Sequence, residues 1–395
     1  MKALDDIFVL DLSRILAGPW ATQILGDLGA DVVKVERPER GDDTRGWGPP
    51  FLTDAKTGAQ GDASYFLCAN RNKRSIALDI TSPKGQETIR ALAAKADVLV
   101  ENYKVGGLRK YGLDYESLSK VNPKLIYCSI TGFGQDGPLA KKAGYDFMIQ
   151  AMGGMMSING ERDGLPGAGP QKVGIALADL STGLYATIAI LGALHQRERS
   201  GKGQHIDMAL LDTQVAMLAN HATSYFISGR VPSRLGNGHA TIVPYQSFPT
   251  ADGHLVIAVG NDEQFARLAT ELGHPEWGED ARFSTNAARV KHRDELLPLL
   301  EAETRKHNAA ELQATLEARV IACGEINTID KVFELPQAKA RGLLQHVDHP
   351  LVGQLPIGAS PLRLSDSPVT YDRAPPLVGQ HTEEVLREKL GCASR

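Results

Sequence analysis

The sequence predicts an α/β protein whose main domain is a Rossmann-like parallel sheet with helices on both faces. In residues 1–140, short apolar runs such as "DVVKVE" and "DVLVEN" alternate with amphipathic segments of helical period. Strands that are buried on both faces read as near-continuous apolar runs. Strand and helix signals in strict alternation are typical of doubly wound α/β domains.

The expected elements of this region can be taken in order. "IFVLDL" is the first strand, and it leads to a helix over 18–30 with Pro19 in its first turn. "DVVKVE" and "SIALDI" are the next strands. A helix over 82–96 follows, in which Ser82 is suited to be the N-cap and Pro83 the first helical residue. The strand "DVLVEN", a short helix around "ESLSKV" and the strand "KLIYCSITGF" complete the pattern.

Beyond residue 140 the pattern changes twice. Helical periodicity covers 145–158, 181–201 and 204–228, and Gly201 after several basic residues is a typical helix end. From about 225 the chain is rich in turns, with short strands, an "ADG" hairpin turn and polar helices. We therefore divide the chain into four parts. These are a large N-terminal part (1–200), a helical linker (201–224), a small α+β domain (225–325) and a proline-rich C-terminal part that ends with a helix and returns to the large domain (326–395).

Composition excludes several classes of protein. A net charge of −4 indicates no general affinity for nucleic acid or anionic membranes. No apolar run approaches the roughly 18 uninterrupted residues of a membrane span, and the first ten residues do not resemble a signal peptide. The eleven histidines and four scattered cysteines show no metal-ligand spacing, so we expect no metal site and a reduced thiol inventory in a cytoplasmic protein; the cysteines are Cys68, Cys128, Cys323 and Cys392.

Basic residues recur where successive predicted strands end. Because the carboxyl ends of parallel strands meet at one edge, these side chains form a rim there. Cations suit phosphates and an aromatic ring suits a base, so the rim favours a phosphorylated, nucleotide-like ligand over a merely solvated charged surface. Its members are Lys34, Arg37, Arg40, Arg45, Asn70, Arg71, Asn72, Lys73, Arg74, Asn102, Tyr103, Lys104, Arg109 and Lys110. The first turn, "DLSRILAGPW", is not a GxGxxG fingerprint, which argues against a dinucleotide.

One acid, Asp179, lies in the otherwise small and apolar segment 173–194. A carboxylate costs several kcal/mol to bury without partners. Asp179 directly precedes a predicted helix, so it is suited to cap that helix, and a cap also aims a carboxylate. Asp146 at an earlier helix start has the same two interpretations. No serine elbow or P-loop is present, which leaves a carboxylate nucleophile or an acid/base for an enzyme without metal.

Several stretches, taken together, resemble the class III CoA-transferases. They include "VLDLSRILAGPWATQILGDLGADVVKVERPERGDDTR", "NRNKRSIALDI", "GYDFMIQA", "ALADLSTGLYA" and "GKGQHIDMALLD", and the resemblance runs from about residue 5 to 390. Within the family, "GDDTRGWGPPF", "IVPYQSFPTADG" and "PPLVGQHT" are most similar to succinyl-CoA:glutarate CoA-transferases. The resemblance implies an interlocked homodimer, whose large domain is built from both chain ends. It also implies that acyl-CoA is a substrate and that no cofactor is tightly bound.

The resemblance also implies roles for individual residues. The family's nucleophilic aspartate falls on Asp179. The implied CoA contacts are Arg14, Leu16, Ala17, Arg37, Asn72, Lys73, Asn102, Tyr103, Lys110, Tyr145 and Asp146. A glycine-rich substrate loop matches the region of Gly260, although this chain has no glycine run there. For the small acid, a remote carboxylate needs cations or donors, and the candidates are Arg45, His239, Tyr245 and Gln246.

Tyr145 distinguishes between branches of the family. The related α-methylacyl-CoA racemases have a histidine at this position, and it moves an α-proton together with the aspartate. Tyrosine has an ordinary pKa of about 10 and is a far weaker base near neutral pH. The sequence therefore favours a CoA-transferase, with racemase activity or CoA binding without transfer as the alternatives.

Overall fold

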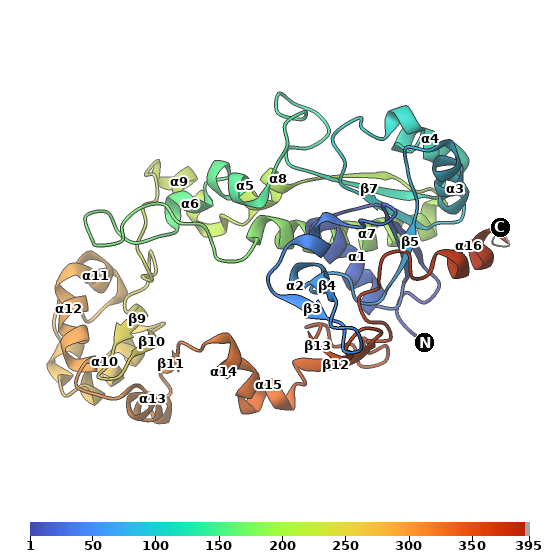
Figure 1. The fold of residues 1–395 in the computed structure, drawn as a ribbon. Helices are drawn as coiled ribbons and strands as arrows, with labels where there is room; N and C mark the ends of the chain where they lie inside the picture. Colours follow the sequence, from blue (N-terminus) through green and yellow to red (C-terminus); the bar gives the residue numbers. More distant parts are fainter. Residues whose placement is uncertain (392–395) are drawn as a thin grey trace. The chain divides into compact units, whose positions relative to one another are not determined.

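The computed structural model describes residues 1–391, and the chain within them divides into two compact units. Within the described residues, unit 1 comprises 1–155, 172–229 and 336–391, and unit 2 comprises 156–171 and 230–335. Unit 1 therefore contains both ends of the described chain (Figure 1). Cys68, Cys128 and Cys323 are free thiols, whereas Cys392 lies outside the described residues.

The centre of unit 1 is a six-stranded sheet in which every neighbouring pair is parallel. The strand order β5-β2-β1-β6-β7-β8 reverses direction between β1 and β6, which is the topological switch where ligands of such sheets bind. The strands are β1 (Phe8–Asp11), β2 (Asp31–Glu36), β5 (Lys73–Ala77), β6 (Val98–Glu101), β7 (Ile126–Thr131) and β8 (His205–Ala209).

Helices cover both faces of this sheet, and each face has its own apolar core. One core joins α1 (Ala17–Asp27) and α7 (Leu177–Ser200) to the sheet, and the other joins α3 (Pro83–Ala93), α4 (Tyr115–Val121) and α16 (Thr382–Leu390). The Ser82 hydroxyl accepts the Gly85 N–H at 3.0 Å, and Gly201 ends α7 with φ 69°, so both predicted helix boundaries are confirmed. The parallel α/β architecture is likewise confirmed.

The C-terminal segment packs against the beginning of the chain. Helix α16 lies beside β5 (Figure 1), and the His381 N–H donates to the Ser75 carbonyl at 2.9 Å. Two short sheets accompany the large one: β3 (Phe51–Thr53) with β4 (Gln60–Ala63), and β12 (Leu344–His349) with β13 (Gly353–Gly358). The remaining elements of this unit are η1 (Asp43–Gly46), α2 (Ser64–Leu67), η2 (Arg109–Tyr111), α5 (Asp146–Met152), α8 (Leu210–Ala216), α9 (Ala219–Ser228) and α15 (Pro336–Ala340).

Unit 2 is an antiparallel three-stranded sheet packed on helices. The predicted "ADG" turn joins β9 (Tyr245–Pro249) to β10 (His254–Ala258), and β11 (Ala322–Glu325) pairs with β10. Its core includes Phe248, Phe265 and Leu296. The helices are α10 (Asp262–Glu271), η3 (Pro275–Gly278), α11 (Asn286–Lys291), α12 (Arg293–Thr304), α13 (Ala309–Ala318) and α14 (Ile329–Glu334), with α6 (Met155–Ile158) where the chain passes from unit 1.

Two helical predictions were wrong in part. The segment 145–158 forms two short helices instead of one, because Gly153 and Gly154 interrupt it and Gly154 has φ 85°. The segment 204–228 begins with β8, the edge strand of the large sheet, so 201–224 is not a purely helical linker. At the edge of the sheet, β8 pairs with β7 alone, and its sequence continues without a break into α8.

One helix in the described part of the chain, α7, has the length and composition of a membrane span, with a mean hydropathy of 1.5. Half of its apolar window is buried inside the protein, and α7 packs along α1. Core helices commonly have this composition.

Candidate active site

Asp179 lies in the first turn of α7, and its side chain makes no capping hydrogen bond. The helix-cap interpretation of this residue is therefore wrong. Within residues 1–391, the carboxylate of Asp179 has no hydrogen-bond or ion-pair partner. Burial, and after it the negative charge of Asp146, raise its pKa to about 7. A carboxylate with this pKa is a stronger base, and hence a better nucleophile, than an ordinary aspartate.

Asp146 caps the helix instead. One of its oxygens accepts the Ala178 N–H at 2.8 Å, and the other accepts the side-chain amide of Gln150 at 2.9 Å. The Gln150 carbonyl oxygen accepts the Val173 N–H at 2.9 Å. Asp146 and Gln150 thus hold the segment that leads into α7, and the same carboxylate supplies the like charge that raises the pKa of Asp179.

The sequence analysis did not single out Tyr65, which lies near Asp179, or Trp47, which contacts Tyr65. Burial and then the charge of Asp179 raise the pKa of Tyr65 to about 12, which places this phenol within electrostatic reach of the carboxylate. The Trp47 ring meets the Tyr65 ring edge-on, with centroids 5.3 Å apart. Both follow the second strand, and the available signal was the aromatic cluster around "GWGPPF" and "SYF".

The crossing of α1 and α7 sets the position of Asp179. A Cβ on Gly183 would lie 2.7 Å from the Ala17 carbonyl oxygen, so only glycine permits this approach. One turn further on, the Thr187 hydroxyl contacts the Ala21 carbonyl at 3.5 Å, and the two helices therefore run in the same direction. Asp179, one turn before Gly183, is level with the turn that precedes α1.

That turn offers unused donors. Helix α1 has no side-chain cap, and the backbone N–H groups of Ala17 and Gly18 have no acceptor among the described residues. Ile15 has φ 71°, an unfavourable conformation for a β-branched residue. The Asn102 side chain pairs with both the N–H and the carbonyl of Arg14, at 2.9 and 2.6 Å. The Asn102 side chain thus fixes this turn, and the unused N–H groups lie at the level of Asp179.

A buried ion pair supports the turn from behind. Lys34 and Asp42 are fully buried, with Nζ 2.9 Å from the carboxylate. Lys34 donates to the Ser13 carbonyl at 2.8 Å, and Asp42 accepts the Ile15 N–H at 3.2 Å. Burial alone would raise the pKa of Asp42, but Lys34 and the Thr44 N–H lower it to about 2. Asp42 is therefore ionised throughout the physiological range.

A narrow cavity opens where β1, β2 and β6 end. Arg14 lies over the Tyr103 ring at 5.4 Å and pairs with Asp43 at 2.8 Å, and Arg37 pairs with the same carboxylate. The structure thus brings three predicted contacts together, namely Arg14, Arg37 and Tyr103. Leu78 and Ile80, which the sequence analysis missed, line the same cavity. They end the third strand signal, "SIALDI", and supply an apolar wall for a flat ring.

Comparison with known proteins identifies the family. The profile of CoA-transferase family III matches residues 4–382. A succinate–glutarate CoA-transferase of Agrobacterium fabrum is 51% identical over 98% of this chain and 95% of its own length, and succinyl-CoA:glutarate CoA-transferase of Mus musculus is 46% identical over 99% and 87%. The chain belongs to CoA-transferase family III. A crystal structure of a CaiB/BaiF family protein from Brucella suis superposes with a TM-score of 0.87, at 51% identity and over 98% and 99% of the two chains.

Other predicted contacts of this CoA-transferase lie apart from the cavity or are already engaged. Leu16 and Ala17 are buried at the start of α1, and Lys110 is exposed on η2 with Nζ 4.7 Å from the Tyr111 ring centre. Tyr145 is 68% exposed at the start of α5, and both oxygens of Asp146 serve the helix cap.

Asn72 and Lys73 do not reach the cavity. The ammonium of Lys73 is fully buried and donates to Asp11, Asn70 and the Pro19 carbonyl. The Asn72 amide bonds with Asp27 and with the backbone of 370–373, which joins the two ends of the chain. These hydrogen bonds occupy the polar atoms of both side chains, which hold the fold of the CoA-transferase together.

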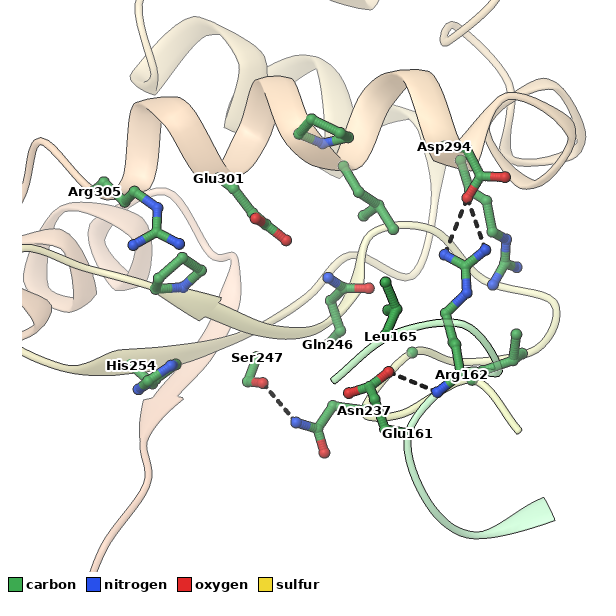
Figure 2. A pocket seen from close by; sticks show the side chains of 16 residues that line it. Glu161, Arg162, Leu165, Asn237, Gln246, Ser247, His254, Asp294, Glu301 and Arg305 are labelled. Carbon is green, nitrogen blue, oxygen red and sulfur yellow. Dashed lines mark hydrogen bonds and ion pairs between the residues drawn. The ribbon is translucent and has the colours of Figure 1, made fainter. Parts of the chain in front are cut away.

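The substrate candidates are divided between the two units. Arg45 is buried in unit 1, where it pairs with Glu36 and Asp62 and stacks over Phe66 at 3.6 Å, so it is not free to bind an acid. The other candidates are in unit 2. The His239 and Tyr245 rings lie 5.3 Å apart, and the Gly260 N–H donates to Gln264 at 2.7 Å. Gln246 lines a separate cavity in unit 2 (Figure 2). No group of three or more potential metal ligands occurs among the described residues of this CoA-transferase.

Proposed function

We propose that this CoA-transferase moves CoA from succinyl-CoA to glutarate, with Asp179 as the nucleophile. The observation that carries the chemistry is a carboxylate without partners, with a pKa raised to about 7, at the level of unused backbone donors. The named activity of relatives that are 46–51% identical over nearly the whole chain supports the choice of acids.

The first half of the reaction converts the donor thioester into an enzyme thioester. A carboxylate oxygen of Asp179 attacks the succinyl-CoA carbonyl, the C–S bond breaks, and CoA leaves as a thiolate from a mixed anhydride. The thiolate then attacks the aspartyl carbonyl of that anhydride. Succinate leaves with the electron pair of the broken C–O bond, and Asp179 carries CoA as a thioester.

The second half repeats these steps in reverse order with the acceptor. A glutarate carboxylate attacks the aspartyl thioester, CoA thiolate leaves, and an aspartyl–glutaryl anhydride forms. The thiolate attacks the glutaryl carbonyl, which gives glutaryl-CoA and restores the Asp179 carboxylate. No proton is consumed, and one thioester forms for each one that breaks.

The surroundings of Asp179 suit these steps. Each attack places a negative charge on a carbonyl oxygen, and the N–H groups of Ala17 and Gly18 are unused donors at the level of Asp179 that suit this charge. Removing a single donor of this kind typically lowers the rate by about 10²–10³. The Tyr65 ring near Asp179, with the Trp47 ring against it, adds apolar surface that limits the access of water and so protects the anhydrides from hydrolysis.

The narrow cavity between Arg37, Tyr103 and Leu78 suits the nucleotide end of CoA. Arg14 and Arg37 share the single carboxylate of Asp43, so their remaining donors are available to phosphates. Leu78, Ile80 and the Tyr103 ring offer apolar surface to the base. We place Lys110 at the edge of this site as a further phosphate contact.

Isotope-free mass spectrometry tests the nucleophile. Incubation with succinyl-CoA followed by hydroxylamine is expected to leave an aspartyl hydroxamate at Asp179. Asp179→Asn is expected to lose exchange by at least about 10³ while it retains CoA binding, because only the attacking oxygen is removed. Asp212→Asn, which alters an exposed first-turn acid of α8, is the matched control and keeps wild-type activity. An unmodified Asp179 together with an active Asn variant contradicts the assignment.

Chromatography of new thioesters tests the acceptor. With succinyl-CoA as donor, kcat/KM is expected to be highest for glutarate and at least tenfold lower for monocarboxylates of the same chain length, because the latter lack the remote carboxylate. An enzyme that prefers butyrate or oxalate retains the family activity but refutes the proposed acids.

We also propose a homodimer of interlocked subunits. An apolar groove of about 880 Å³ in unit 1 runs between α1, α7 and residues 356–364. Leu184, Tyr185 and Ile188 of α7 remain exposed beside it, and large exposed apolar surfaces typically mark interfaces. Light scattering after gel filtration is expected to give twice the chain mass of 42.6 kDa. A monomer at micromolar concentration rules this proposal out.

A further inference from the structure

Unit 2 contains a cavity of about 370 Å³ that plays no part in the mechanism above. Helix α12 forms its roof, the hairpin β9–β10 its floor, and residues 161–165 one of its ends (Figure 2). Charged side chains dominate its walls, with three guanidinium groups and three carboxylates; these are Arg162, Arg293, Arg305, Glu161, Asp294 and Glu301. Their formal charges cancel.

Some of these charges are already paired within the protein. Arg162 donates to Asp294 through two nitrogens at 3.0 Å, and its backbone N–H donates to Glu161 at 2.7 Å. Arg293 donates to the Ala240 carbonyl at 2.9 Å. One end of the cavity is therefore a fixed, internally satisfied wall.

The other end is not paired within the protein. Among the described residues, the side chains of Glu301, Arg305 and Gln246 have no hydrogen-bond or ion-pair partner. Figure 2 shows Glu301 and Gln246 pointing into the same space from the helix and from the strand. Glu301 lies in the last turn of α12 and Arg305 is its C-cap residue, four positions later. An ion pair at this spacing would contribute only about 0.2–0.5 kcal/mol, so it would compete weakly with a ligand.

We propose that this cavity binds a free α-amino acid. The ammonium group meets Glu301, the carboxylate meets Arg305, and the Gln246 amide bridges to either group. Both charges of an α-amino acid are attached to one carbon, which matches two side chains whose Cβ atoms are roughly 5–6 Å apart. A dicarboxylate gains less, because the lining has no net positive charge and Glu301 repels the second carboxylate.

The remaining walls indicate the side chain of the ligand. Leu165, Leu297 and Pro298 provide apolar surface between the charged groups, which suits an aliphatic side chain. The volume of about 370 Å³ lies near the lower end of the range of about 300 to 1,000 Å³ for pockets of drug-sized ligands. The cavity therefore suits a ligand as small as an amino acid, together with a few waters. The inference is independent of the proposed transferase substrates.

Calorimetric titration of the wild-type protein with ligand analogues tests the chemistry without mutation. Leucine, its methyl ester, its N-acetyl derivative and glutarate form the series, all titrated in the presence of saturating CoA. Leucine is expected to bind in the millimolar range or tighter, and loss of either charge is expected to weaken binding at least about tenfold, as for the loss of a charge-assisted hydrogen bond. Equal affinity for the ester or the N-acetyl derivative overturns the proposal.

Two variants locate the binding site. Glu301→Gln keeps the side-chain length and removes the negative charge, and Arg305→Gln removes the guanidinium group. Each variant is expected to weaken leucine binding at least about tenfold. Arg267→Gln removes a half-buried arginine of α10 that pairs with Glu263 outside the cavity, and is expected to leave leucine binding unchanged. The proposal is overturned if leucine does not bind at concentrations up to roughly 20 mM. It is also overturned if all three variants retain leucine binding, or if the wild type binds glutarate and the two cavity variants do not. Transferase activity of each variant, measured in parallel, reports that the fold is intact.

Discussion

At the scale of single residues, the reactivity of Asp179 depends on the hydrogen bonds that its neighbours do not make with it. Asp146 is close enough to add its negative charge, but its carboxylate accepts hydrogen bonds from Ala178 and Gln150 and has no donor to offer Asp179. The carboxylate is thus destabilised as an anion, which increases its reactivity and lowers the stability of the fold.

Protonation of Asp179 makes the stability of the fold depend on pH. The pKa of Asp179 rises from 3.8 to about 7 on folding, so the folded protein binds more protons than the unfolded chain between these values. Stability therefore falls as pH rises from 4 to 7. At about 1.36 kcal/mol per unit, the ionised group costs at most about 4 kcal/mol above pH 7. Asp179→Asn is expected to be more stable than wild type at pH 8 and nearly equal at pH 4 in urea unfolding. A constant difference across this range would falsify the coupling.

Protonation of Asp179 also makes the rate of transfer depend on pH. Only the ionised carboxylate attacks, so kcat/KM is expected to fall as pH drops below about 7. Asp146→Asn keeps an oxygen that accepts the Ala178 N–H but removes the like charge. Its pH–rate profile is expected to retain an acidic limb that lies at lower pH than in the wild type. A limb at the same pH means that another group controls it.

At the scale of elements, the approach of α1 and α7 carries the geometry of the site, because Gly183 lets α7 contact the backbone of α1. Gly183→Ala pushes the new methyl group against the Ala17 carbonyl. We expect a loss of about 1–3 kcal/mol in stability, as for other overpacked sites, and a decrease in kcat larger than any change in KM for CoA.

Gly192 offers the matched control on the same helix. A Cβ at this position has nothing within 4 Å, so Gly192→Ala is expected to be neutral or to stabilise α7 by up to about 1 kcal/mol. Thermal unfolding and steady-state kinetics of the two variants separate the steric effect from helix propensity. If both variants behave alike, the α1–α7 approach does not set the site.

The sequence predicted those elements whose signals are local. Ser82 and Gly201 mark helix boundaries that depend on a few neighbouring residues, and both were found. Strand β8 was missed because its assignment depends on β7, a partner some 75 residues away. For the same reason the cap of α7 was assigned to Asp179, although the acid that performs it, Asp146, is about 30 residues distant.

At the scale of the whole molecule, the closure of the chain explains residues whose charge or polarity suggested ligand binding. Arg74 pairs with Asp31, Glu384 and Glu388, and thereby ties β5 to β2 and α16. Such a cluster cannot be distinguished from a phosphate site in the sequence, since both need cations at strand termini. Only the tertiary contacts show which basic side chains are fully paired within the protein and which, like Arg14 and Arg37, retain free donors.

Asn72 gives the last prediction, because here the two roles can be separated experimentally. Its amide makes four hydrogen bonds, to Asp27, Thr370, Asp372 and Arg373, at 2.8 to 3.2 Å. Asn72→Gly removes them without straining the backbone, whose φ is 58°. We expect a loss of about 2–4 kcal/mol in stability from the unpaired buried groups, and an unchanged Kd for CoA.

Arg37→Ala is the reciprocal variant, since its side chain is 48% exposed and belongs to the cavity at the switch of the sheet. It is expected to weaken CoA binding about tenfold or more with little change in Tm. Calorimetry and thermal unfolding of both variants therefore give opposite patterns if closure of the chain and CoA binding are carried by different residues. If the Kd for CoA rises in Asn72→Gly as much as in Arg37→Ala, Asn72 belongs to the CoA site after all. The C-terminal segment that Asn72 contacts would then position the ligand.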